Sequence, residues 1–452
     1  MQDHRPYWNM EIEPRLNMPE IKEMQWAKLR KKIDNLYNGT SFWRSRLDDN
    51  GVKPGQIKTW EDFERRIPLF TKEEYRQYSE ECDGDMDRIL EGLLGQDAKR
   101  LVFISTTSGT TGAPTPYPFT KGDMDLWAEY CKRMLWRCGV FPGDRLLHAF
   151  GLSMHIAGIP QVIGFSEYGV CVIPVGAEAG SEAILKFAKL FKPKAMACTP
   201  SLAEYIIEKA RVSVEEGVDS MNISVLLCGG EPGAGIPEVR SKIENTFNAK
   251  LFDIGGGGCS CDYPEYQGMH FFIDDYLYFE LVDPATHEHV PLEDGATGLI
   301  AHTQIGGSTT LAGLRQTTND IMQVYTSPCP CGRTGFRYKI IGRADDMLKV
   351  KGVMVYPPAI EGVINSFAPR VTGEFRIVLD EPLPRVVPPL KLRVEYGEGV
   401  QEIELAGLEK ELAEAMHARV KIRPEIIWTA PNTLERFLKK KKIFEKTYEK
   451  EG

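Results

Sequence analysis

The segment "FISTTSGTTGAPTPYPFT", residues 103–120, places hydroxyl side chains and glycines directly after an apolar, strand-like run. A strand that ends in such a turn exposes several backbone N–H groups and hydroxyls in one small concavity. Concavities of this kind bind anions, above all polyphosphate. The segment has no G-x-x-x-x-G-K-[ST] pattern, so it is not a Walker A loop. Its composition favours a phosphate cradle over a merely structural turn.

Three cysteines and one histidine form a second set of candidate ligands: Cys261, His270, Cys329 and Cys331. Thiolate and imidazole groups suit a closed, tetrahedral, structural Zn²⁺ site. The Cys-x8-His and Cys-x-Cys spacings are not those of a standard zinc finger. A zinc site and a set of packed thiols with a surface histidine therefore both stay open.

The composition of the chain restricts the class of protein. Its 452 residues carry a net charge of −9, which gives no support to nucleic-acid binding. Because no run of apolar residues approaches the length of a membrane span, we expect no membrane segment. The polar start "MQDHRPYWN" and the thinly spread cysteines predict a cytoplasmic protein with reduced thiols.

The elements that must position these residues change in type along the chain. Apolar residues recur at helical spacing in 18–37 and again in 60–78, so the N-terminal third is predicted to be helical. From Arg100, short apolar runs such as "RLLHAF" and "ISVLLCGG" alternate with helical segments. This alternation predicts βαβ units and a mostly parallel sheet.

A second module is expected after Arg343. The order strand, helix, strand, strand, helix, strand over about 100 residues is the ferredoxin-like split pattern. The sequence therefore predicts an α/β fold with a large N-terminal domain, 1–343, and a small C-terminal α+β domain, 344–452. The lysine run Lys439–Lys442 near the end suits a solvated basic tail on composition alone.

Several segments resemble one family in order along essentially the whole chain. "TTSGTTGAP" resembles the phosphate loop of the adenylate-forming (acyl-CoA synthetase, firefly luciferase) superfamily. "LLCGGEPG", "CPCGRTG" and "IGRADDMLKVKGVMVYPPAIE" are most similar to its phenylacetate–CoA ligase branch. In this branch similar Cys/His positions recur, which favours the zinc site.

The resemblance implies ATP contacts at Ser108, Gly109, Thr110, Thr111, Gly112, Gly229, Gly230, Glu231, Pro232, Asp253, Ile254, Asp320 and Arg343. It implies that Gly229–Pro232 lie against adenine, although on their own they suit an ordinary exit from a strand. Asp320 would hold the ribose hydroxyls with its paired acceptors. Arg343 would lie between the ribose and the small domain, and Asp345 would be the hinge.

The residues expected to act in catalysis are Lys440, Thr110 and Thr111. Alignment of "TLERFLKKKK" with the family's terminal motif favours Lys440 among four neighbouring lysines. The threonines belong to the expected phosphate loop, in which Ala113 stands where a lysine is common. One cationic phosphate contact of the family is thus expected to be absent.

The chain departs from the branch at "GGGGCSC", residues 255–261. Gly255 replaces an aromatic residue, and Cys259 falls roughly where a Mg²⁺-binding glutamate belongs. Glu265 is the candidate substitute from a shifted loop. Four consecutive glycines allow close approach of the backbone to a ligand, or a mobile loop. The departure is compatible with an unusual substrate or with lost activity.

The function implied is an ATP-dependent acyl- or aryl-CoA ligase, an acid–thiol ligase that forms an acyl-adenylate and releases AMP and pyrophosphate. Its cofactors and partners would be ATP, Mg²⁺, coenzyme A, a small carboxylic acid and a structural Zn²⁺, with a homodimer as the candidate assembly. Phe150 and His155 are the candidate acid-pocket residues, although a packed histidine suits the pattern equally well. The alternatives are a carrier-protein or amine acceptor, and a nucleotide-binding pseudo-enzyme.

Overall fold

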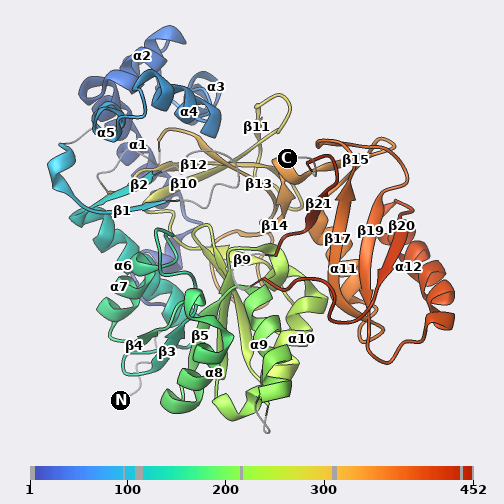
Figure 1. Ribbon diagram of the computed structural model, residues 1–452. Helices are drawn as coiled ribbons and strands as arrows, with labels where there is room; N and C mark the ends of the chain where they lie inside the picture. The colour runs from blue at the N-terminus through green and yellow to red at the C-terminus, as the bar shows by residue number, and fades with distance from the viewer. Residues whose placement is uncertain are drawn as a thin grey trace.

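The computed structural model describes residues 6–94, 97–106, 116–213, 217–307, 313–437 and 441–449. The chain forms an N-terminal module, which ends with strand β14 (Arg337–Arg343), and a C-terminal module, which begins with β15 (Leu348–Val350). The C-terminal module, orange to red in Figure 1, lies beside α10 (Pro237–Phe247) and β14, and its helix α11 (Pro357–Asn365) contacts both. A site between the two modules is therefore built from residues far apart in sequence.

The first hundred residues are helical, as their apolar spacing predicts. The elements are η1 (Glu13–Arg15), α1 (Pro19–Gly39), α2 (Ser41–Asp49), η2 (Pro54–Gln56), α3 (Trp60–Arg66), α4 (Lys72–Glu81), α5 (Met86–Leu93) and η3 (Ala98–Arg100). The helical pattern of 60–78 is interrupted because Pro68 keeps Ile67 out of the helical region, with ψ at 117°. The chain restarts as α4 at Thr71, which forms a capping box with Glu74.

Within the described residues the central sheet has twelve strands in the order β11-β10-β12-β13-β14-β9-β8-β7-β6-β5-β3-β4. Strands β4, β3, β5, β6 and β7 pair in parallel, and the pairs from β7 to β11 are antiparallel. The strands are β3 (Arg145–His148), β4 (Cys171–Pro174), β5 (Ala195–Cys198), β6 (Val225–Gly229), β7 (Lys250–Gly255), β8 (Gly258–Ser260), β9 (Met269–Phe271), β10 (Leu277–Val282), β11 (His289–Val290), β12 (Thr297–Gln304) and β13 (Gln316–Tyr325). The parallel half follows the predicted βαβ pattern, and its carboxyl ends offer a binding edge.

Helices cover the parallel strands, and apolar side chains fill both of their faces. The helical segments are α6 (Lys121–Arg137), α7 (Ile159–Tyr168), η4 (Ala177–Ala179), α8 (Gly180–Phe191), α9 (Pro200–Ser213), η5 (Val218–Met221) and η6 (Pro232–Gly235). Consecutive residues of β6, Leu226 and Leu227, enter different apolar clusters because side chains alternate along a strand. The run "VLLC", residues 225–228, is therefore apolar throughout, as a strand buried on both faces must be.

A short antiparallel hairpin, β1 (Leu101–Thr106) with β2 (Pro116–Thr120), precedes α6. Residues 107–115, which connect these strands, lie outside the described residues. The predicted strand "RLVFIST" is therefore present, and it pairs with β2 in a sheet of its own.

The C-terminal module contains a four-stranded sheet in the order β20-β19-β17-β21 and the helices α11 and α12 (Leu405–Val420). Its other elements are η7 (Ala344–Asp346), β16 (Val353–Val355), β17 (Val371–Leu379), β18 (Arg385–Val386), β19 (Lys391–Tyr396), η8 (Glu402–Glu404), β20 (Glu425–Thr429) and β21 (Phe444–Lys446). The structure differs from the predicted strand order at the first strand of this module. The run 347–355 folds into the hairpin β15–β16, because Lys351 and Gly352 both adopt positive φ, 49° and 86°.

The hairpin lies in a separate three-stranded sheet with β18, and the four-stranded sheet is completed at its edge by β21, which pairs in parallel with β17. Strand β21 directly follows the lysine run, so the run leads into the module's sheet rather than into a free tail. Among the described residues, every helix is too short or too polar to cross a lipid bilayer.

Candidate active site between the two modules

The expected adenine segment lies at the carboxyl end of β6. Gly229 approaches β7 so closely that a Cβ there would stand 2.2 Å from the carbonyl oxygen of Ile254. The next residue, Gly230, has φ of +85°, in the left-handed region that favours glycine. The glycine pair thus lets the chain leave the strand tightly and turn into Glu231 and Pro232.

The carboxylate of Glu231 fixes this segment to its surroundings. One oxygen accepts the backbone N–H of Ser201 at 2.6 Å, at the start of α9. The other accepts the backbone N–H of Lys441 from the C-terminal module at 3.3 Å. Burial raises the pKa of Glu231, against the effect of these hydrogen bonds. Glu231 therefore connects the nucleotide segment to both modules.

Asp253, on the neighbouring strand β7, is a buried carboxylate. Its backbone N–H donates to the Ser260 hydroxyl at 2.9 Å, and one carboxylate oxygen accepts the Tyr266 hydroxyl at 2.6 Å. Burial raises the pKa of Asp253 to about 6. Its neighbour Ile254 pairs with Gly229 across the strands, so both predicted residues lie at the sheet edge that carries the adenine segment.

The structure gives the glycine run 255–258 a structural role as a hairpin turn. Gly255 pairs with Gly258, and the two residues between them have φ of +56° and +87°. Two positive φ values are typical of the type I′ turn that joins tightly paired strands. The Tyr338 hydroxyl donates to the Gly255 carbonyl at 2.6 Å and packs against the turn.

Cys259 follows this turn and is packed in the core. It is 1% exposed, and its Sγ lies 3.4 Å from the Sγ of Cys138. The side chain at the position of the family's glutamate thus faces apolar surroundings rather than the site. Glu265 is exposed on the loop between β8 and β9.

Asp320, Arg343 and Asp345 come together where the chain enters the C-terminal module. Asp320 and Arg343 are opposite one another on β13 and β14, and Arg343 Nη1 lies 3.3 Å from Asp320 Oδ1. Arg343 also donates to both carboxylate oxygens of Asp345, at 2.8 and 2.7 Å. One guanidinium thus bridges the expected ribose acid and the expected hinge.

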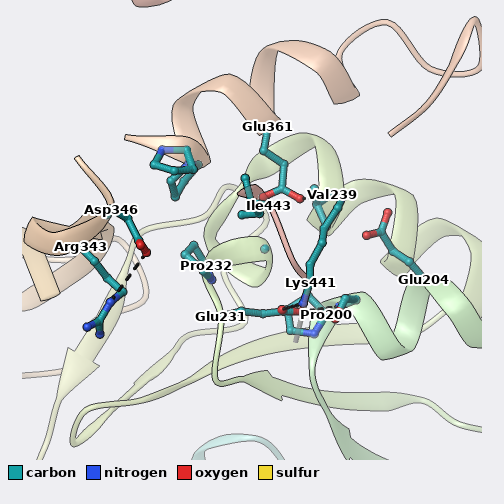
Figure 2. A pocket seen from close by; sticks show the side chains of 15 residues that line it. Pro200, Glu204, Glu231, Pro232, Val239, Arg343, Asp346, Glu361, Lys441 and Ile443 are labelled. Carbon is teal, nitrogen blue, oxygen red and sulfur yellow. Dashed lines mark hydrogen bonds and ion pairs between the residues drawn. The ribbon is translucent and has the colours of Figure 1, made fainter. Parts of the chain in front are cut away.

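A pocket opens between the modules beside these residues (Figure 2). It is lined by Pro200, Ser201, Glu204, Glu231, Pro232, Gly233, Val239, Gly342, Arg343, Asp346, Pro357, Pro358, Glu361, Lys441 and Ile443. The sequence prediction contained Glu231, Pro232 and Arg343. It missed Glu204, Glu361 and Lys441, since nothing in the sequence indicates which acidic residues of the two modules face each other.

The expected acid-pocket residues lie beside the strand that leads into the phosphate segment. The Thr106 backbone N–H donates to the Met154 carbonyl, and Thr106 pairs with His155 in a parallel bridge. Phe150 is buried in the main core. His148, which the prediction did not include, hydrogen-bonds through Nε2 to the Ala157 carbonyl at 2.9 Å, and burial lowers its pKa to about 4.

Some of the predicted site residues lie outside the described residues. They are Ser108, Gly109, Thr110, Thr111, Gly112 and Lys440. Their roles stay predictions, and the experiments below address them through activity.

The four predicted metal ligands do lie together. Their ligand atoms are all within 4.8 Å of one another. Cys261 Sγ is 3.9 Å from Cys329 Sγ, and Cys331 Sγ is 3.4 Å from His270 Nε2. His270 Nδ1 bonds the Thr334 carbonyl at 3.1 Å, an arrangement that leaves Nε2 for a metal.

Comparisons with known proteins agree with this fold. The AMP-binding enzyme family matches residues 57–256, and the AMP-binding enzyme C-terminal domain matches residues 352–446. The chain therefore belongs to the class of adenylate-forming enzymes.

Its relatives define a branch of that class. The chain is 31% identical to the phenylacetate-coenzyme A ligase of Thermus thermophilus, over 90% of this chain and 88% of that protein. It is 27% identical to the Escherichia coli protein of the same name, over 78% and 77% of the two chains. The protein is a member of the phenylacetate–CoA ligase-like branch and, as such, an acid–thiol ligase.

Solved structures add information on the arrangement of the modules. 2-Hydroxyisobutyryl-CoA ligase in the postadenylation state, bound to 2-HIB-AMP, superposes with a TM-score of 0.88 at 25% identity, over 99% of this chain and 93% of that one. The same enzyme in the thioesterification state gives a TM-score of 0.69 at 26% identity, over 97% and 92%. The modules are thus placed more nearly as in the postadenylation structure.

Proposed function

We propose that this protein activates a small carboxylic acid with ATP and passes its acyl group to coenzyme A. In the first half-reaction a carboxylate oxygen attacks the α-phosphorus of ATP, which gives an acyl-adenylate and releases pyrophosphate. In the second, the thiol attacks the acyl carbon, and AMP leaves. Glu231, Pro232 and Arg343 line one inter-module pocket, and Asp320 is bonded to Arg343; this arrangement supports the proposal.

The first step needs neutralisation of charge more than a protein nucleophile. We assign this task to the segment Ser108–Gly112, with the Thr110 and Thr111 hydroxyls, and to Lys440. Adenylate-forming CoA ligases use ATP and coenzyme A, generally with Mg²⁺. Cys259 stands roughly where the family has its Mg²⁺-binding glutamate, but it has no carboxylate and is packed in the core. We therefore assign the Mg²⁺ contact to a carboxylate elsewhere in the chain.

We also propose that residues 1–343 and 344–452 are domains that rotate about Asp345 between the two half-reactions. The contact of Arg343 with Asp320 and Asp345 supports a hinge there, because it joins the last strand of one module to the first turn of the other. The higher TM-score with the postadenylation structure supports a first arrangement, and the thioesterification structure represents the second.

The acid that we propose is aromatic or short and branched. The relatives act, by their names, on phenylacetate and 2-hydroxyisobutyrate. Phe150 and His155, beside the strand that leads to the phosphate segment, are the candidate contacts.

ATP–pyrophosphate exchange with a panel that includes phenylacetate, benzoate and 2-hydroxyisobutyrate tests the first step. We expect exchange that depends on one class of acid, and AMP release that then depends on coenzyme A. Absence of exchange with every acid would instead indicate a nucleotide-binding pseudo-enzyme. Exchange without a coenzyme A effect would indicate a carrier-protein or amine acceptor. A homodimer also stays a prediction, which light scattering of the purified protein tests.

We further propose that Cys261, His270, Cys329 and Cys331 hold one structural Zn²⁺. Tetrahedral Zn–S bonds of 2.3 Å place two sulfur atoms about 3.8 Å apart, close to the 3.9 Å between Cys261 and Cys329. The ion would join the end of β8, strand β9 and the loop before β14, and so brace the strand that leads to the hinge.

Elemental analysis of the purified protein should find about one zinc per chain. Cys331→Ser should lose it and lower the melting temperature, because structural zinc contributes directly to folding free energy. Cys171→Ser, at an exposed cysteine outside the set, is the matched control. The zinc site would be contradicted if the purified wild-type protein contained no zinc and Cys331→Ser left the melting temperature unchanged.

A further inference from the structure

Lys441 is a buried lysine in a run that composition assigns to solvent. Its side chain is 7% exposed, whereas Lys442 beside it is exposed. A lysine is seldom buried unless its charge is paired. The reason for the burial of Lys441 therefore has to be found in its partners.

Three oxygen atoms of the C-terminal module surround the ammonium of Lys441. Nζ lies 3.0 Å from the Gly373 carbonyl, 3.3 Å from Glu361 Oε1 and 3.4 Å from Glu374 Oε1. It also lies 5.2 Å from the centroid of the Phe375 ring. We call Glu361, Glu374 and the Gly373 carbonyl the ammonium cage.

Burial acts to lower the pKa of Lys441, but the carboxylates of Glu361, Glu374 and Glu204 outweigh it and hold the pKa above its ordinary value. The side chain is therefore a fixed cation. Two hydrogen bonds and a further ion pair hold the ammonium inside the C-terminal module, so it is directed away from a phosphate or an acyl oxygen in this arrangement. Lys441 is consequently ill suited to be the catalytic lysine.

The backbone of Lys441 points to a different task. Its amide N–H donates to Glu231 Oε2 at 3.3 Å, in the segment expected beside adenine. The ammonium cage belongs to α11 and β17 of the C-terminal module, and Glu231 belongs to the N-terminal module. Lys441 is thus held by one module and bonded to the other (Figure 2).

We propose that Lys441 is a positioning residue for acyl-adenylate formation, which holds the C-terminal module against the Glu231 segment of the proposed nucleotide site. The caged ammonium and the amide that donates to Glu231 belong to the same residue, so a change that loosens the cage also loosens this contact between the modules. The inference rests on the proposed function, in which Lys440 serves the first half-reaction. It adds that the two neighbouring lysines have separate tasks: Lys440 acts in catalysis, and Lys441 positions the site.

The link to Glu231 is made in an arrangement close to the postadenylation structure. If the C-terminal module rotates for the second half-reaction, the cage travels with it and the bond to Glu231 breaks. Lys441 should therefore affect adenylation and spare thioester formation. A residue that merely stabilises the fold would affect both steps alike.

The test compares Lys441→Met, Lys440→Ala and the control Lys442→Met in both half-reactions. Lys441→Met should lower kcat of carboxylate-dependent pyrophosphate exchange about 10²-fold, the scale expected when a catalytic group is displaced by about 1 Å. We expect KM for ATP and the rate of thioester formation from supplied acyl-adenylate to change less than about twofold. Lys440→Ala should reduce exchange to background, and Lys442→Met should resemble the wild type.

Two results would overturn the proposal while leaving the proposed function intact. The first is normal exchange by Lys441→Met, and the second is equal loss of both half-reactions, each with Lys440→Ala inactive. If Lys440→Ala keeps full exchange while Lys441→Met loses it, Lys441 is itself catalytic and the division of tasks is wrong.

Lys441→Met leaves the buried Glu361 carboxylate without its cation, while Glu374 keeps its pair with Arg376, and such a variant can fail to fold. Glu361→Gln then replaces it, because it loosens the cage and keeps the lysine charge. It should show a smaller loss, roughly tenfold, with the same restriction to the first half-reaction. Unchanged exchange in a folded Glu361→Gln protein that has lost the Lys441 contact would overturn the proposal equally.

Discussion

Asp253, an expected ATP contact, is a buried carboxylate whose ionisation acts against folding. It is 8% exposed, and burial raises its pKa from 3.8 to about 6. The Tyr266 hydroxyl and the charge of Arg240 compensate only in part. A raised carboxyl pKa means that the folded protein binds the proton more tightly than the unfolded chain does. Ionisation of Asp253 therefore costs free energy of folding, as is common for residues of binding sites.

We predict that Asp253→Asn stabilises the protein in a pH-dependent manner. The wild type should lose stability as the pH rises from about 4 to 6, and the neutral asparagine should not. The gain should be small near pH 4 and reach roughly 2–3 kcal/mol above pH 6, where it levels off. Chemical denaturation of both proteins from pH 4 to 8 measures it. A gain that is the same at every pH would contradict the raised pKa.

The sequence supplied most of the individual residues of the site but not their contacts. Asp320, Arg343 and the four candidate metal ligands could be named because each belongs to a short motif, and the structure brings them together in two groups. The sequence named Lys441 only as one of four candidate lysines, and it gave no sign of Glu361 and Glu204, because contacts across the two modules are not encoded by spacing along the chain. The acidic partner of a lysine can be named only when both are placed in space.

At the scale of elements, the glycine run shows how a departure from a family pattern can be structural. The motif analysis left open close approach to a ligand or a mobile loop. The structure instead contains a tight turn, in which Gly257 has φ of +87° and Gly258 faces the Tyr338 hydroxyl. A two-residue turn is the shortest way to join β7 to β8.

We predict that Gly257→Ala is strongly destabilising. A Cβ at this position would lie 2.6 Å from Ile273 Cδ1 and 2.8 Å from Phe271 Cε2, in addition to the strain of the left-handed backbone. The two effects together should cost about 2–4 kcal/mol of unfolding free energy. Urea denaturation measures it.

Gly295→Ala is the matched control. Gly295 has φ of +84°, and a Cβ there would meet nothing within 4 Å. Only the backbone strain remains, so the expected loss is about 1–2 kcal/mol. Equal losses for the two variants would show that the turn is not packed as described.

Element types were predictable where a single period dominates. The helices of the first hundred residues and the buried strands β5 and β6 follow directly from apolar spacing. The break at Pro68 and the hairpin at Lys351 and Gly352 depend on single residues inside otherwise continuous patterns. The pairing of β21 with β17 was not predictable, because its few residues follow a charged run and carry no strand signal of their own.

At the scale of the whole molecule, ion pairs of modest strength join the two modules. Arg436 lies 3.2 Å from Glu208, and Arg419 lies 2.8 Å from Glu238. Partly exposed pairs of this kind contribute little free energy each, roughly 0–1 kcal/mol. An interface held in this way can open without a large barrier, as an enzyme with two working arrangements requires.

The hinge prediction can be tested at Asp345, whose carboxylate holds Arg343 at 2.7 Å. Asp345→Ala removes this contact and leaves the backbone free, so any loss from the contact alone appears in this variant. Asp345→Pro removes the same contact and also fixes φ near −65°, which resists a rotation that must change the backbone there. Measured against Asp345→Ala, the proline variant should keep pyrophosphate exchange within about threefold and lose most of the thioester formation, on the order of tenfold or more. The ratio of thioester formation to pyrophosphate exchange can then be compared between Asp345→Pro and Asp345→Ala. If the two variants have the same ratio, the backbone at Asp345 is not the hinge, and the boundary between the domains must be placed elsewhere.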